Sequence, residues 1–320
     1  MQRKQVFLLL GILLVIVILA LLPVAIKKES TINLIILILL YTMLGTSWNI
    51  LGGYTGQTNL GHAAFFGLGS ITTRFLWLNG LNIFPSLLAG GLVAVAFAMI
   101  IGTPAFKLKG AYFAIGMLAL AEVLNVTVGN LFPTISSLSA EYLGSYQLLP
   151  RYYLFVGMAI LIISCTYFLV NSKIGLGMMA VREEEDAAES LGINARTHKL
   201  IALAVSTFFA GMVGGAFAYY YVSYYPQYPF SPVWTFDSIT MVFIGGTGTM
   251  IGPIIGAIFF VVLKELLALK LQELHIIVFA VLFIAVVLFL PGGLVEVWTK
   301  LKYYFRLKFP QKKTGNLPGV

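Results

Sequence analysis

The chain has 320 residues, of which 59% are hydrophobic and only 10% are charged, and its mean hydropathy is +0.95. Because an average soluble domain is about 25% charged, this composition excludes a large soluble domain and indicates a polytopic membrane protein. The formal net charge of +8 does not indicate nucleic-acid binding, because the basic residues cluster beside apolar segments. The single cysteine, Cys165, can form no intramolecular disulfide.

Apolar segments joined by short polar turns recur along the whole chain. A helix that crosses a bilayer needs about 20 mostly apolar residues, and the sequence offers about ten such segments. The first is too long for the apolar core of a signal peptide and is interpreted as a span. The sequence therefore predicts an all-α polytopic membrane bundle, with segments near residues 6–26, 32–52, 60–78, 84–106, 110–128, 152–171, 199–221, 236–251, 252–270 and 276–291.

The distribution of basic residues predicts the orientation of these segments. With the N-terminus inside, fourteen of the 20 lysines and arginines fall in regions assigned to the cytoplasm. Such a bias favours a cytoplasmic location for both termini and an external location for the 129–151 loop. We expect one membrane domain over residues 1–299, with a cytoplasmic loop at about 172–199, followed by a basic cytoplasmic tail over 300–320.

The loop at about 172–199, called the charged loop below, is the most polar part of the chain. Five of the chain's twelve acidic residues fall within residues 183–189. Written as one helix over 181–193, the loop places polar side chains at i, i+3, i+4 and i+7 on one stripe, namely Arg182, Glu185, Asp186 and Glu189. Mostly away from that stripe lie Val181, Ala187, Ala188 and Leu191, and Gly192 follows. This pattern favours docking to another protein.

Two glycine-rich stretches interrupt the apolar pattern. The first glycine break covers residues 52–61 and is followed by His62, and the second covers residues 245–253. Opened backbone persists in a membrane only where protein or a water-lined cavity satisfies its polar groups. The breaks are interpreted either as tight turns between adjacent spans or as discontinuous elements beside a substrate path.

On the second interpretation, helix ends at the breaks would present backbone N–H groups to a carboxylate. The candidate translocation path then comprises Gly56, Gln57, Asn59, His62, Gly245, Gly246 and Gly248. The counter-interpretation is that these glycines serve only close helix packing.

No motif for catalysis, a cofactor or a metal is present in the sequence. There is no Gly-Lys dipeptide and hence no phosphate-binding loop, no His-Glu-x-x-His pair and no Gly-x-Ser-x-Gly turn. We therefore expect a chain that is not an enzyme and does not itself hydrolyse ATP. Arg74 and Glu122 are the candidate buried charges, expected to meet within the bundle. Alternatively, Arg74 reaches the external headgroups and Glu122 is hydrogen-bonded within the bundle.

Four ordered blocks of the sequence resemble a known family. They are residues 54–69, residues 109–115 with the later Ala121-Glu122, residues 180–192, and residues 244–257. Together these blocks resemble the LivM-type permeases of branched-chain amino acid ABC importers, over roughly residues 35–300. The resemblance implies that the charged loop presses into an ATPase subunit.

The resemblance further implies half of a translocation pore in a bacterial inner membrane, working by alternating access. The implied partners are two cytoplasmic ATPase subunits that bind ATP, a second homologous permease and an external solute-binding protein. The implied cargo is a branched-chain or other small amino acid, although the same family includes permeases for urea and short amides. The alternative is a secondary transporter or channel without an ATPase, using Glu122, Arg74 or Asp237 as ion-coupling groups; such a carrier has less need of a charged docking helix.

Overall fold

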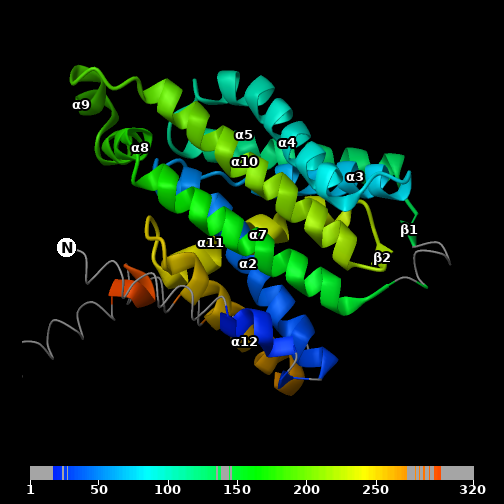
Figure 1. The fold of residues 1–320 in the computed structure, drawn as a ribbon. Coiled ribbons are helices and arrows are strands. Elements are labelled where there is room, and N and C mark those ends of the chain that lie inside the picture. Colours follow the sequence, from blue (N-terminus) through cyan, green and yellow to red (C-terminus); the bar gives the residue numbers. More distant parts are fainter. Residues whose placement is uncertain are drawn as a thin grey trace, which may run out of the picture.

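The computed structural model describes residues 17–23, 25–26, 28–134, 136–137, 144, 146–271, 278, 281, 284, 288 and 292–296. These residues form a helical bundle, which confirms the predicted all-α class (Figure 1). The predicted segments 6–26 and 276–291 lie mainly outside the described residues, and the tail over 300–320 lies wholly outside them.

Helices account for nearly all of the regular structure in the described ranges. The strands β1 (Ser136–Ser137) and β2 (Ser223–Tyr224) pair antiparallel, and η1 (Tyr228–Phe230) is a 3-10 turn. The α-helices are α2 (Glu29–Gly52), α3 (His62–Leu78), α4 (Ile83–Ala105), α5 (Ala111–Leu131), α7 (Leu148–Val170), α8 (Lys173–Glu183), α9 (Glu185–Ser190), α10 (Ala195–Tyr220), α11 (Pro232–Gly245) and α12 (Gly252–Leu271).

Most predicted segments coincide with one helix each. In the described part of the chain, five helices are long and apolar enough to cross a membrane, namely α2, α4, α5, α7 and α10. The predicted span at 236–251 is wrong, because α11 ends at Gly245. With 14 residues, α11 is about 21 Å long, too short for a hydrocarbon core of about 30 Å.

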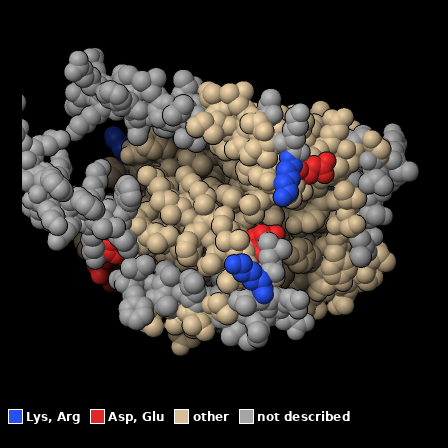
Figure 2. Space-filling model, turned by 90° about the horizontal axis from the view of Figure 1, so that it is seen from below, with Lys and Arg blue, Asp and Glu red and all other residues tan. Residues whose placement is uncertain are grey.

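Helices α2 and α10 form the centre of the bundle. Within their most apolar windows, 78% of α2 and 72% of α10 are buried, against 33% of α4 and α7 and 28% of α5. A helix that is apolar on all sides is surrounded by protein or by lipid, and α2 is surrounded by protein. The outer helices leave large apolar side chains on the surface, and Figure 2 shows a face on which only a few described residues are Lys, Arg, Asp or Glu. Such a surface suits contact with lipid.

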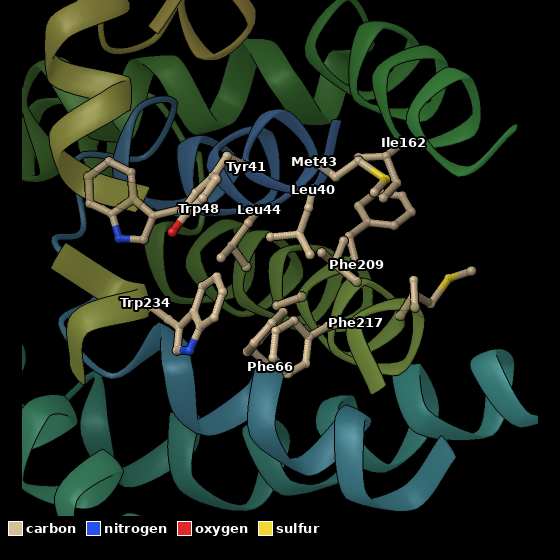
Figure 3. Packing of buried hydrophobic residues seen from close by; sticks show 14 of the residues in the cluster. Leu40, Tyr41, Met43, Leu44, Trp48, Phe66, Ile162, Phe209, Phe217 and Trp234 are labelled. Atoms are coloured by element: carbon tan, nitrogen blue, oxygen red, sulfur yellow. The ribbon is translucent and has the colours of Figure 1, made fainter. Parts of the chain in front are cut away.

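Two kinds of contact join the inner helices. Phe66 of α3, Phe217 of α10 and Trp234 of α11 form one aromatic cluster, with ring centroids 5.1 to 5.3 Å apart (Figure 3). Helices α3 and α10 also pack backbone against backbone, because a Cβ on Gly69 would collide with the backbone of Gly211. Small residues therefore allow α3 to lie directly against α10.

Arg74 of α3 binds the carboxyl end of α10 and not Glu122. Its Nη1 donates to the carbonyl oxygens of Ala218 at 2.8 Å and Tyr221 at 3.0 Å, and its Nη2 donates to that of Val222 at 3.2 Å. The last carbonyls of a helix have no partner within the helix and carry partial negative charge, so they attract a cation. Arg74 is 3% exposed, which confirms the prediction that it is buried.

The expected burial of Glu122 and its pairing with Arg74 are wrong. Glu122 lies on an exposed face of α5, where its carboxylate accepts from Asn125 Nδ2 at 3.3 Å. None of the ion pairs among the described residues joins Arg74 to Glu122. The hydrogen-bond acceptors of Arg74 are the carbonyl oxygens at the end of α10 and not the predicted carboxylate of Glu122.

We predict that Arg74→Gln lowers the free energy of unfolding by roughly 2–4 kcal/mol, because hydrogen bonds to a charged group contribute about 1.5–3 kcal/mol each and several are lost. Thermal unfolding in mild detergent measures this as a lower Tm. Glu122→Gln is the comparison variant and is expected to leave the Tm of the isolated chain unchanged. The two effects should add, so a coupling energy above about 0.5 kcal/mol in the double-mutant cycle would contradict this assignment.

Candidate functional site

The charged loop contains two short helices, not one. Helix α8 ends at Glu183, Glu184 is extended with φ −159° and ψ 111°, and α9 begins at Glu185. The predicted single stripe over 181–193 is therefore wrong, because Arg182 belongs to α8 and the other members of the stripe belong to α9. Figure 1 shows α8 and α9 at one end of the bundle, opposite β1 and β2.

Helix α9 is fixed to the start of α10 by an ion pair and a small apolar cluster. Lys199 Nζ lies 2.6 Å from Glu185 Oε2, and the lysine side chain is only 7% exposed. Val181, Ala188 and Ala195 pack together beneath the loop. The outer surface carries Asp186, Ala187, Glu189, Leu191 and Gly192, all exposed. Leu191 is 83% exposed, so this surface combines an apolar side chain with acidic ones.

Arg182 extends from the charged loop to both glycine breaks. Its Nη1 donates to the carbonyl oxygen of Gly53 at 2.8 Å. A Cβ on Gly56 would lie 3.3 Å from Arg182 Cγ, and a Cβ on Gly248 would collide with Arg182 Nη1. In the turn after α2, burial raises the pKa of Tyr54 to about 12, although the nearby charge of Arg182 opposes the shift. The charged loop and the two glycine breaks therefore meet at the guanidinium of Arg182.

The first glycine break contains buried, non-helical backbone beside the end of α2. After a turn at Gly56, where φ is +71°, the chain runs back along α2 before α3 begins. Trp48 Nε1 donates to the carbonyl oxygen of Asn59 at 2.9 Å, and Asn59 Oδ1 accepts from the amide of Gly61 at 2.9 Å. Side chains thus satisfy backbone groups that a helix would satisfy internally.

The start of α3 is closed by neighbouring helices. His62 Nε2 lies 2.9 Å from Ser47 Oγ of α2, and the amide of Ala63 donates to Thr235 Oγ1 of α11 at 2.8 Å. The amide of Ala64 already donates to the carbonyl oxygen of Gly61 at 3.0 Å. The expectation that this helix end presents free N–H groups to a carboxylate is therefore wrong for Ala63 and Ala64.

The second glycine break is a tight turn held by α2. Thr249 Oγ1 donates to the carbonyl oxygen of Gly246 at 2.8 Å and accepts from the amide of Gly252 at 3.0 Å. Asn49 of α2 accepts from the amide of Gly248 at 2.9 Å and donates to the carbonyl oxygen of Thr249 at 3.0 Å. Sequence reasoning missed Asn49, because nothing in its local pattern distinguishes it from a packed polar residue.

The two glycine breaks differ in structure, and the interpretation as tight turns fits the second. The second break is a tight turn between α11 and α12, whereas the first combines a turn at Gly56 with a non-helical stretch in which Asn59 and Gly61 are buried. The candidate path residues differ in exposure: Gly56 is exposed, Gln57 and Gly248 are half-buried, and Asn59, His62, Gly245 and Gly246 are buried. Arg182 and Asn49 bring the two breaks together, and a role of these residues in translocation stays a prediction.

A cluster of three polar side chains, which was not predicted from the sequence, joins α2, α11 and α12. Asp237 Oδ2 accepts from Lys264 Nζ and from Tyr41 Oη, each at 2.9 Å. The side chains of Asp237 and Lys264 are 15% and 39% exposed. The sequence contained a signal for this pair. Asp237 and Lys264 are ionisable residues in two apolar segments that a short turn joins, and ionisable groups at membrane depth usually pair. Within the described residues, no three His, Cys, Asp or Glu side chains gather as a metal site would require.

Five helices of the described residues are long and apolar enough to cross a membrane, and the outer ones surround α2 and α10. This architecture defines a multi-pass membrane protein. The sequence profile of the family described as branched-chain amino acid transport system, permease component, matches residues 30–287, so the chain belongs to this family.

Two relatives illustrate the similarity. The high-affinity branched-chain amino acid transport system permease protein LivM of Escherichia coli K12 is 27% identical, over 83% of this chain and 70% of its own. The probable branched-chain amino acid transport permease protein LivM of Methanocaldococcus jannaschii is 24% identical, over 83% of this chain and 94% of its own. No solved structure gives a significant match.

We predict that Gly248→Ala destabilises the chain more than Gly80→Ala does. Both glycines have positive φ, +69° and +90°, so both variants carry a backbone cost of about 1–2 kcal/mol. A Cβ at Gly80 meets nothing within 4 Å, whereas one at Gly248 displaces Arg182. Thermal unfolding in mild detergent measures the difference as a lower Tm for Gly248→Ala. Equal losses for the two variants would show that Arg182 does not occupy this space.

Proposed function

We propose that this chain is the permease subunit of an ATP-driven importer that translocates branched-chain or other small aliphatic amino acids. Family membership supports the class of transport system, and the names of both relatives support the cargo. The observation that carries the proposal is the contact of Arg182 with both glycine breaks. A loop that only capped the bundle would have no need to reach these elements.

The proposed assembly has two cytoplasmic ATPase subunits, a second homologous permease and an external solute-binding protein. ATP binds to the ATPase subunits, which fits the lack of a phosphate-binding loop in this sequence. We place the chain in a bacterial inner membrane with both termini in the cytoplasm, as the distribution of basic residues favours. The exposed surface formed by Asp186 and Glu189 of α9 and by Leu191 directly after it is the part of the charged loop that would bind an ATPase subunit.

Coupling in this proposal proceeds through packed groups. The ion pair of Lys199 with Glu185 holds α9 on α10, so a displacement of α9 also moves the start of α10. Arg182 then transmits the displacement of α8 to the two breaks. The helices on either side of the breaks would respond by opening the bundle toward one side and closing it toward the other, as alternating access requires.

We predict that Asp186→Lys with Glu189→Lys uncouples ATP hydrolysis from transport. Both side chains are exposed, so the fold is retained while the charge of the docking surface is reversed. Glu185 is left unchanged because its partner is Lys199 of the same chain. The measurement is leucine uptake per ATP hydrolysed by the reconstituted complex, and a fall of tenfold or more is expected. Glu29→Lys, an exposed acid at the start of α2, is the control and should keep the wild-type ratio.

Parallel uptake assays with leucine, urea and ribose test the cargo. The proposal expects ATP-dependent uptake of leucine and not of the other two solutes. Uptake of urea alone would contradict the amino-acid assignment while leaving the class of importer intact. Uptake of leucine without any ATPase subunit would contradict the importer itself and support a secondary transporter.

A further inference from the structure

An apolar groove lies between the outer helices α4 and α7, called the α4–α7 groove below. It has a volume of about 540 Å³, and α10 contributes Met212 and Tyr219 to its lining. On α7 the lining runs from Pro150 to Leu161, which is about 16 Å along the helix axis at 1.5 Å per residue. A hydrocarbon core is about 30 Å thick, so the groove extends through about one leaflet of a bilayer.

A smaller and more polar cavity, called the polar hollow below, continues the α4–α7 groove. Its volume is about 310 Å³, and it is lined by Trp77 of α3 and by residues 80–82 of the turn before α4. Ile83 and Tyr219 line both the groove and the hollow, so the two adjoin. Together they form one site with an apolar part and a polar part.

Two buried arginines lie behind the aromatic walls of the polar hollow. The guanidinium carbon of Arg74 lies 5.6 Å from the centroid of the Trp77 ring, and that of Arg151 lies 4.4 Å from the centroid of the Tyr219 ring. Both arginines are 3% exposed, so water screens their charges weakly. None of the ion pairs among the described residues includes Arg151. The positive charge behind these walls favours an anionic group in the hollow.

Aromatic side chains place the polar hollow at the surface of the membrane. Helices α3 and α10 end, and α4 and α7 begin, toward the end of the bundle that carries β1 and β2 (Figure 1). Trp77, Tyr146, Tyr153 and Tyr219 lie at these helix ends, and Trp and Tyr concentrate at headgroup depth. From this level the α4–α7 groove extends toward the centre of the membrane.

We propose that one phospholipid binds at this site, with an acyl chain in the α4–α7 groove and its phosphate in the polar hollow. A phospholipid has the same division, an apolar chain that extends through one leaflet and an anionic phosphate at the membrane surface. Asn82 Oδ1 accepts from the amide of Phe84, which leaves Asn82 Nδ2 to donate to a phosphate oxygen. Basic pockets between membrane helices bind lipid headgroups in this way. The inference does not depend on the proposed function.

A glycine of α7 offers the variant that tests the proposal. Gly157 lines the α4–α7 groove, and a Cβ on it would meet nothing within 4 Å, so Gly157→Phe places a ring in the groove. Ala96→Phe is the matched control, because Ala96 is exposed on α4 and does not line the groove. Leu88→Trp, at a groove residue that is 50% exposed, replaces Gly157→Phe if that variant cannot be purified.

Binding of dioleoyl phosphatidylglycerol to the full-length chain is measured after the protein has been stripped of lipid in mild detergent. Native mass spectrometry counts the bound lipids, and a titration gives the Kd of the tightest one. We expect the wild type and Ala96→Phe to bind one lipid with the same Kd, and Gly157→Phe to bind it at least tenfold more weakly. An unchanged Kd for Gly157→Phe would overturn the proposal. A wild-type chain that binds no lipid would also overturn it, because protein would then fill the groove.

Two further ligands separate the contributions of the two parts of the site. Dioleoylglycerol has the same chains without the phosphate and should bind the wild type at least tenfold more weakly than the phospholipid does. Equal binding of dioleoylglycerol would contradict a phosphate in the polar hollow. Inorganic phosphate at millimolar concentration should not displace the phospholipid. Its displacement by phosphate would overturn the assignment to a lipid and indicate a site for free anions.

Discussion

The hydrogen bond from Arg182 to the carbonyl oxygen of Gly53 is the interaction on which the rest of the site depends. The Arg182 side chain occupies space that two glycines leave open, with its Cγ near Gly56 and its guanidinium near Gly248, and the positive φ angles of both glycines are ones that other residues rarely adopt. The extended residue Glu184 separates α8, which carries Arg182, from α9, which carries the exposed surface proposed to bind an ATPase subunit. The charged loop thus contacts the bundle through Arg182, while the surface of α9 is exposed.

Helix α10 connects the two ends of the molecule. At its start, Lys199 holds α9 through Glu185, and at its end, Arg74 and Arg151 bind its last carbonyl oxygens. Between these ends α10 packs directly against α3 through Gly69 and Gly211. Among the described residues, the buried Lys199 lies against an acid, and the buried Arg74 and Arg151 lie against a helix end, so the cost of desolvating each charge is offset. The helix that the charged loop contacts is thus also held along its length by α3 and at its end by Arg74 and Arg151.

The sequence predicted the helical class and most helix positions, because long apolar segments leave few alternatives in a membrane. It failed where the outcome depended on contacts between distant residues. Arg74 found carbonyl acceptors at the end of α10 and not Glu122, and no local pattern announces such acceptors. Asn49 was missed for the same reason. The pair of Asp237 with Lys264 could have been predicted, because both are ionisable residues in apolar segments. The charged loop was predicted as one helix because the break at Glu184 contains neither glycine nor proline.

Replacement of Arg182 is the most direct test of the central claim, that this residue connects the charged loop to the glycine breaks. In the reconstituted complex, Arg182→Ala should leave ATP hydrolysis running and the subunits assembled, while leucine uptake falls tenfold or more. Arg196→Ala, which removes an exposed arginine from the same loop, should leave uptake unchanged. Wild-type uptake by Arg182→Ala would contradict the account, because the connection would then carry no part of the coupling.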